Sequence, residues 1–178
     1  GRMSPNPIRH LDPFGLIMLF LVGFGWATTP VNPNMLRGNP RKSMMIVAVA
    51  GPLANLAMAI LFAIPIRLGI DATCSESILP TAFQIMRTGV WINLVLFTFN
   101  LLPIPPLDGF TILLGLLPAD LAYRLAGLRQ YGSLILIALI VLPQFTGFSF
   151  IGQVIAPIIS ALTKVLTGYS DLLLQIAC

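Results

Sequence analysis

The stretch Asn100-Leu-Leu-Pro-Ile-Pro-Pro-Leu-Asp108-Gly109 decides the fold, because it ends a long apolar segment with three prolines and a carboxylate. The prolines cannot all lie in one regular helix, since each lacks a backbone N–H and its ring clashes with the preceding turn. We therefore expect the helix to unwind here. Non-helical backbone at membrane depth is tolerated only where protein or a water-filled cavity covers it. An ionisable group at that depth is costly unless it is paired, hydrated or metal-bound. Asp108 is thus expected to face a polar cavity and to be functional.

Composition predicts an integral membrane protein of the cell membrane. Of 178 residues, 57% are hydrophobic and 9% charged, with a mean hydropathy of +0.92, whereas soluble domains carry about 25% charged residues. Fifteen glycines and fifteen prolines indicate interrupted helices. Cys74 and Cys178 have neither metal-site spacing nor a disulfide pattern. The net charge of +4 reports membrane topology, and no basic patch for nucleic acid is present.

The apolar runs predict an all-α, multi-pass membrane protein in a single domain, residues 1–178. About four transmembrane helices are expected, since a spanning helix needs about 20 apolar residues. A fifth run, Phe14 to Thr28, is too short to span and is interpreted as re-entrant or interfacial. We expect a loop over Leu116 to Gln130 and, after it, a closing helical hairpin. The predicted spans are Met44 to Ile66, Gly89 to Leu102 with an extension toward Leu107, Tyr131 to Leu142, and Phe148 to Leu166.

The basic residues predict the orientation, because cytoplasmic loops carry an excess of Lys and Arg. With a re-entrant first segment, two basic residues lie on the outer side, Arg67 and Arg87. Eight lie on the other side: Arg2, Arg9, Arg37, Arg41, Lys42, Arg124, Arg129 and Lys164. If the first segment spans instead, the count becomes six against four. The re-entrant interpretation fits better and places Asp108 near the cytoplasmic side.

Four further phrases accompany the Asp108 stretch. They are Asn6-Pro7-Ile8-Arg9-His10-Leu11-Asp12-Pro13-Phe14-Gly15, Phe24-Gly25-Trp26-Ala27, Pro30-Val31-Asn32-Pro33 and Ala50-Gly51-Pro52-Leu53-Ala54-Asn55. Each is weak evidence alone. Together, in order, spacing and wording, they resemble the compact prokaryotic branch of the site-2 protease family, which are intramembrane zinc metalloproteases. The resemblance covers about the first 115 residues.

The resemblance implies a zinc cofactor, one ion, with Asp108 as one protein ligand. It also implies two histidines and a general-base glutamate from a His-Glu-x-x-His helix. That motif is absent from this sequence, which has one histidine, His10, and one glutamate, Glu76. In the family the missing helix directly precedes the stretch that begins here at Gly1. The chain also has no start methionine, so we expect the helix to lie upstream. A true loss of the motif and a helix on a separate chain are the alternatives.

Other residues are expected to line the active site. Asn55 lies within a membrane span, one helical turn after Gly51; the pair serves either a close helix contact or the substrate cavity, and the two roles are compatible. Asn100 and Pro103 belong to the broken segment, whose free backbone groups are expected to pair with an extended substrate. His10 is expected to be structural or to line the site. For Asp108 the alternative to zinc is an N-cap of a helix over Phe110 to Leu117.

We therefore predict an intramembrane zinc endopeptidase that cleaves the transmembrane helices of membrane proteins. Its partners would be the lipid bilayer and a transmembrane protein substrate; the sequence leaves open whether it also forms an oligomer or membrane complex. The main alternative is a non-catalytic relative that acts as a membrane interaction or scaffold subunit without zinc. A transporter is less favoured, because no matched pair of interrupted segments suggests inverted repeats.

Overall fold

The structure is a computed structural model, and it describes residues 38–69, 79–147 and 149–169. Every described residue belongs to one compact unit, residues 37–178. The described residues form helices, turns and loops without a strand, which confirms the all-α prediction for this part of the chain. His10 and the segment Phe14 to Thr28 lie outside the described residues, so their predicted roles stay predictions.

The first described helix, α2, runs from Pro40 to Arg67 over 28 residues. It begins there because the side chain of Asn39 accepts the backbone N–H of Arg41 at 3.0 Å and Pro40 occupies the first helical position. It ends before Gly69, whose φ of +70° no other residue type adopts easily. At 1.5 Å per residue the helix is about 42 Å long, more than the apolar thickness of a bilayer. It is apolar enough to cross a membrane, as predicted for Met44 to Ile66.

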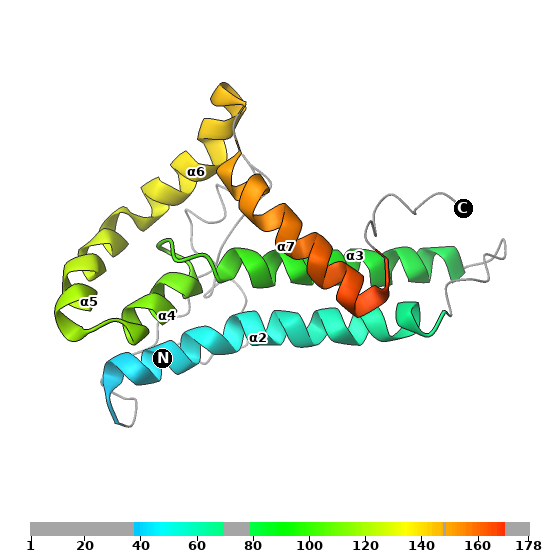
Figure 1. The fold of residues 1–178 in the computed structure, drawn as a ribbon, viewed down its shortest axis with the longest axis horizontal. Coiled ribbons are helices and arrows are strands. Elements are labelled where there is room, and N and C mark those ends of the chain that lie inside the picture. Colours follow the sequence, from blue (N-terminus) through cyan, green and yellow to red (C-terminus); the bar gives the residue numbers. More distant parts are fainter. Residues whose placement is uncertain (1–37, 70–78, 148, 170–178) are drawn as a thin grey trace, which may run out of the picture. The chain divides into compact units, whose positions relative to one another are not determined.

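The proline-rich stretch interrupts the helical structure where predicted. Helix α3 runs from Leu79 to Asn100, residues 101–107 form turns, and α4 runs from Asp108 to Leu116 (Figure 1). The peptide bond between Pro105 and Pro106 is cis.

Helices α2, α3 and α7 (Phe150–Thr167) share the main apolar core. Its buried members are Ala59, Ala63 and Ile66 from α2 with Val90 and Leu94 from α3. Leucine and isoleucine side chains of α7 pack against this cluster. A Cβ on Gly89 would stand 2.8 Å from the ring of Phe62, so the absence of a side chain at Gly89 lets α3 approach α2. The core therefore fixes the three helices against one another.

Much of the apolar surface is exposed, as expected for helices that face lipid. In the most apolar window of α2 only 17% of the residues are buried, against most of them in the core helix of a soluble protein. The second run that could cross a membrane, Ala119–Pro143, is 11% buried. These two candidates, found among the described residues, support a membrane protein; four crossings remain a prediction.

The loop predicted over Leu116 to Gln130 is wrong for most of its length. Only a short turn at Leu117 and Pro118 separates α4 from α5 (Ala119–Ala126), and the 3-10 helix η4 (Gly127–Tyr131) continues to α6 (Gly132–Thr146). The sequence of α5 is amphipathic and contains the charged residues Asp120 and Arg124. It still forms a helix because Ala122 is buried against Phe110 and Leu114 of α4.

The last two helices also differ from the predicted hairpin topology. Helices α6 and α7 are joined at Gly147, which has a φ of +69°, but α7 packs mainly on α3 and α2 (Figure 1). The guanidinium Nη1 of Arg67 lies 2.7 Å from where a Cβ of Gly168 would stand. Lys164, one turn before Gly168, is therefore at the same end as Arg67, and its predicted place on the opposite side is wrong. The distribution of basic residues along the sequence does not indicate that α7 packs back along α2 and α3.

Gly109 gives a test of the sharp corner between α3 and α4. A Cβ at this position would collide with the backbone carbonyls of Leu101 and Leu102, which cannot move without disturbing the end of α3. We expect Gly109→Ala to destabilise the fold by about 1–3 kcal/mol through overpacking. The measurement is thermal unfolding of the purified protein in detergent.

The matched control is Gly127→Ala. Gly127 has φ −58°, and a Cβ added to it would meet nothing within 4 Å, so alanine should be neutral or slightly stabilising. Equal unfolding temperatures for the two variants would contradict the packing described for Gly109.

Candidate metal centre

The loop between α3 and α4 satisfies its own backbone donors. The N–H groups of Leu101 and Leu102 donate to Phe97 and Phe99 in the last turn of α3, at 3.2 and 3.1 Å. Those of Ile104 and Leu107 donate to Leu102 and Ile104, at 2.8 and 2.9 Å. The three prolines have no N–H to satisfy. The loop is thus a compact series of turns that carries the chain from the end of α3 to Asp108.

Asp108 is the first residue of α4 and is half-buried. The N-cap is Leu107, which makes no side-chain cap hydrogen bond, so the N-cap role considered for Asp108 is wrong. The helix starts two residues earlier than expected because the N–H of Phe110 already donates to the Leu107 carbonyl at 3.2 Å. A carboxylate in the first turn is favoured by the helix dipole by about 0.3–1 kcal/mol. The Asp108 carboxylate is not needed to cap the helix, so its oxygens remain available to a ligand.

The carboxylate of Asp108 lies against the backbone of Gly51 in α2. A Cβ on Gly51 would stand 2.9 Å from Asp108 Oδ2 and 3.9 Å from its Cγ. Any side chain on Gly51 would therefore have to displace the carboxylate. The sequence placed both residues in the active site, 57 positions apart, and the structure brings them together.

The other predicted site residues lie on α2, on α3 and in the loop between α3 and α4. Asn55 is half-buried on α2, one turn beyond Gly51, and i and i+4 positions share a helix face. Asn100 is the half-buried last residue of α3, and Pro103 is exposed in the loop. On α3, the hydroxyl of Thr98 is buried without a hydrogen-bond partner among the described residues. Sequence reasoning did not single out Thr98, and a threonine in an apolar helix gives no distinctive signal.

Helix α4 is held against α2 at its far end as well. A Cβ on Gly115 would stand 2.6 Å from the Cβ of Met45, so the two backbones approach closely there. Arg41 donates from Nη2 to the carbonyl of Leu117 at 2.7 Å, which satisfies a carbonyl just after the helix. The sequence analysis missed both residues as supports of the site. The sequence signal for this close approach was Gly115 itself, a second glycine six residues after Gly109 in an apolar stretch.

The described residues supply one candidate zinc ligand at this place. Among them, no group of three His, Cys, Asp or Glu side chains could hold a metal ion. A tetrahedral catalytic zinc takes three protein ligands and one water, so two further ligands must come from elsewhere. The Asp108 carboxylate fits such an ion, because it is half-buried and Gly51 places no side chain against it.

Comparisons with known proteins reveal relatives named as zinc metalloproteases. The chain is 37% identical over 146 residues to a Bacillus subtilis (strain 168) protein named, provisionally, zinc metalloprotease YwhC; the match covers 80% of this chain and 66% of that protein. It is 30% identical over 157 residues to the Rip2 protein of Mycobacterium tuberculosis (strain H37Rv), which has the same kind of provisional name. That match covers 84% of this chain and 58% of Rip2. The chain thus spans between 58% and 66% of the length of these relatives.

A family profile gives the same result. The profile described as peptidase family M50 matches residues 65–143, a range that includes the Asp108 stretch and the corner at Gly109. No solved structure matches the chain significantly. On the profile and the relative from Bacillus subtilis, the chain belongs to peptidase family M50, the site-2 protease family.

Proposed function

We propose that this chain is the Asp108-bearing part of an intramembrane zinc-dependent endopeptidase. The observation that supports the proposal most directly is the Asp108 carboxylate lying over Gly51 between α4 and α2. Family membership and the names of the relatives support zinc and protease chemistry. The intact protein would add the two histidines and the glutamate of a His-Glu-x-x-His helix, which this sequence does not contain.

In this proposal Asp108 binds the ion through its carboxylate, and Gly51 leaves the space that the carboxylate needs. Bound zinc supplies a water with a pKa near 7 and polarises the scissile carbonyl. The glutamate of the His-Glu-x-x-His helix would take and return the proton. Asn55, on the same face of α2 as Gly51, would donate its amide N–H to the substrate carbonyl.

The proposed substrate is a transmembrane helix that is locally unwound at the site. The loop of residues 101–107 donates every backbone N–H that it has within the chain. It can therefore offer an extended substrate only carbonyl acceptors. Pro103 and Pro106 are exposed, and their carbonyls accept no backbone hydrogen bond among the described residues. The sequence predicted that the loop pairs with an extended substrate. In this proposal the substrate N–H groups donate and the proline carbonyls accept.

We also propose a multi-pass protein with about four crossings and its site near the cytoplasmic side. With Lys164 moved to the end of Arg67, the count of basic residues becomes seven against three. The excess still favours the side of Arg41 and Arg129. The membrane setting itself follows from family membership and the apolar helices.

The second candidate is a non-catalytic family member that acts as a membrane interaction or scaffold subunit. One observation favours it: the 178 residues contain a single histidine, so they cannot build the zinc site alone. Zinc analysis of the intact protein separates the two candidates, since the scaffold would purify without the metal.

Replacing Asp108 in the intact protein tests the ligand assignment. Asp108→Asn keeps the size of the side chain but removes the charged oxygen that zinc prefers. We expect zinc content to fall at least about tenfold and cleavage of a transmembrane substrate to be lost, because loss of even an outer-shell partner costs 10–100-fold. Inductively coupled plasma mass spectrometry and a cleavage assay measure the two effects.

The control for this substitution is Asp120→Asn. Asp120 is the exposed acid in the first turn of α5, so the same chemical change there should leave zinc and cleavage unaltered. Wild-type zinc content and cleavage in the Asp108 variant would refute the assignment.

Gly51→Ala separates site geometry from stability. Alanine is a better helix former than glycine by about 1 kcal/mol, so the helix itself should not suffer. Its Cβ would stand 2.9 Å from Asp108 Oδ2 and push the carboxylate away. We expect weaker zinc binding at unchanged or higher thermal stability, measured by chelator competition and thermal unfolding.

Ala57→Ser, which adds one atom at an exposed position of the same helix, is the matched control and should bind zinc normally. The contact between Gly51 and Asp108 would lose its proposed role if the two variants bound zinc equally well.

A further inference from the structure

Helix α5 and the 3-10 helix η4 bury one apolar face and expose large apolar side chains beside it. The inner face packs on α4 through Ala122, Leu125 and Ala126. The outer surface exposes large apolar and aromatic side chains. The exposed fractions are 49% for Leu121, 87% for Tyr123, 41% for Leu128 and 52% for Tyr131. Residues 119–131 thus form a surface segment whose exposed side chains include two leucines and two tyrosines.

Basic side chains surround the same segment. Arg124 and Arg129 are exposed on it. Arg129 donates from Nη2 to Thr111 Oγ1 at 3.1 Å, which holds η4 beside α4. From α2, Arg41 donates to the Leu117 carbonyl in the turn just before α5, and exposed Lys42 follows it. We call Arg41, Lys42, Arg124 and Arg129 the basic corner.

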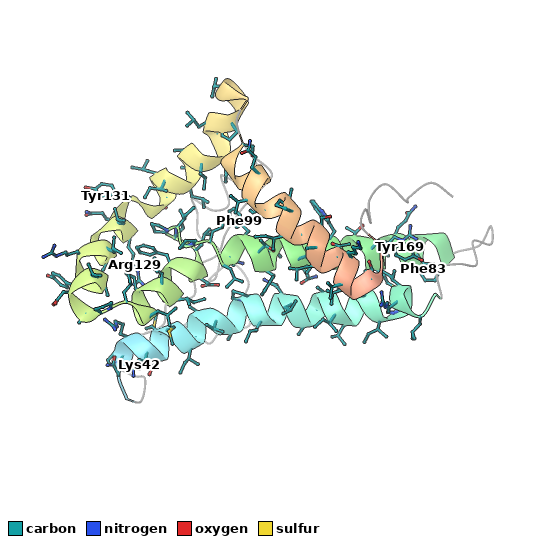
Figure 2. All side chains as sticks on the ribbon, in the orientation of Figure 1. Lys42, Phe83, Phe99, Arg129, Tyr131 and Tyr169 are labelled. Carbon is teal, nitrogen blue, oxygen red and sulfur yellow. The ribbon has the colours of Figure 1, made fainter. Side chains whose placement is uncertain are left out.

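The charge of the basic corner is largely uncompensated within the described residues. The single acidic residue of residues 38–69 and 109–147 is Asp120, in the first turn of α5. Figure 2 shows Lys42, Arg129 and Tyr131 at one end of the described helices and Tyr169 at the other. Because Tyr169 follows α7 and Arg67 lies beside Gly168, the end that carries Arg67 and Lys164 is distant from the basic corner.

We propose that the basic corner binds the phosphate headgroups of anionic phospholipids, with residues 119–131 lying in the membrane–water interface. Amphipathic helices with basic and aromatic residues adopt this position. Tyr123 and Tyr131 would lie at headgroup level, as tyrosines do at membrane interfaces. Leu121 and Leu128 would reach the acyl region. Arginine suits the ligand because its guanidinium binds phosphate oxygens in pairs.

An anionic lipid explains the segment better than an acidic soluble partner. Such a partner would account for the charges, but lipid also accounts for the exposed leucines and tyrosines interleaved with them. The orientation expected from the basic residues places this end at the cytoplasmic leaflet, where a negative surface potential attracts Lys and Arg.

The test compares phosphatidylglycerol with phosphatidylcholine. The purified full-length protein in neutral detergent is titrated with each lipid, and native mass spectrometry counts the bound molecules. The variant is Lys42→Gln with Arg124→Gln, a pair chosen because both side chains are exposed. At about fivefold per basic residue near the headgroups, phosphatidylglycerol binding should weaken about 25-fold, with phosphatidylcholine binding unchanged.

The matched control removes two charges from the opposite end, Arg67→Gln with Lys164→Gln, both exposed. It should keep wild-type affinity for phosphatidylglycerol. A charge-preserving pair, Lys42→Arg with Arg124→Lys, should retain most of the binding, which shows that the loss in the first variant follows its charge; thermal unfolding of the first variant shows that it remains folded. The proposal is overturned if wild type does not prefer phosphatidylglycerol, if the Lys42 and Arg124 variant binds as wild type, or if the control weakens binding equally.

Discussion

The candidate site depends on one constraint, the absence of a side chain at Gly51, where a Cβ would stand 2.9 Å from Oδ2 of the Asp108 carboxylate. A carboxylate near the membrane interior is tolerated only where another group compensates its charge. Gly51 provides space and no charge, so it cannot be that group. The contact therefore fixes where the carboxylate lies and leaves its charge to be balanced by a ligand. Zinc bound by the intact protein is the ligand that the family implies.

The chain reaches this geometry by removing side chains where helices must approach. Gly109 allows α4 to begin against the carbonyls at the end of α3, and Gly115 allows α4 to lie on Met45 of α2. Gly132 similarly lets the start of α6 pack near Pro105 and Pro106, where a Cβ would stand 3.2–3.3 Å from their backbone atoms. Each glycine thus sets one close approach, and together they position a short helix whose first residue is Asp108.

The broken segment satisfies its own N–H groups, as irregular backbone would have to do in lipid, where an unsatisfied polar group costs several kcal/mol. Prolines remove three donors, and the remaining four N–H groups donate within the turns. Only carbonyls are left over. A protease that holds an unwound helix needs acceptors for the free N–H groups of that helix. The prolines that end α3 also leave carbonyl acceptors in the loop, and these suit the proposed substrate.

The sequence predicted the parts of the fold that follow from local chemistry. The length and apolarity of Met44 to Ile66 indicated α2, and the prolines indicated the end of α3 near Asn100. It failed where tertiary packing decides. Residues 119–131 were predicted to lie mostly in a loop, yet they form helices because Ala122 packs against α4. The side assigned to Lys164 was wrong because α7 returns along α2 and α3, which no residue pattern reports.

The candidate site was predictable in part for the same reason. Asp108 is conspicuous as a carboxylate after prolines, and the family resemblance added Gly51. The close approach of the two residues could be seen only in the structure, because it does not follow from spacing along the chain. The same holds for the internal hydrogen bonds that use every N–H group of the loop. His10 lies outside the described residues. Asn55 lies on α2, Asn100 at the end of α3 and Pro103 in the loop after it, and their roles remain predictions.

The most direct test of the central claim is an anomalous-diffraction map of the intact, zinc-loaded protein, collected at the zinc absorption edge. The zinc peak should lie about 2.0–2.2 Å from a carboxylate oxygen of Asp108, with that side chain still against Gly51. A zinc peak bound entirely by other residues, with the Asp108 carboxylate turned toward water, would contradict the role assigned to this residue.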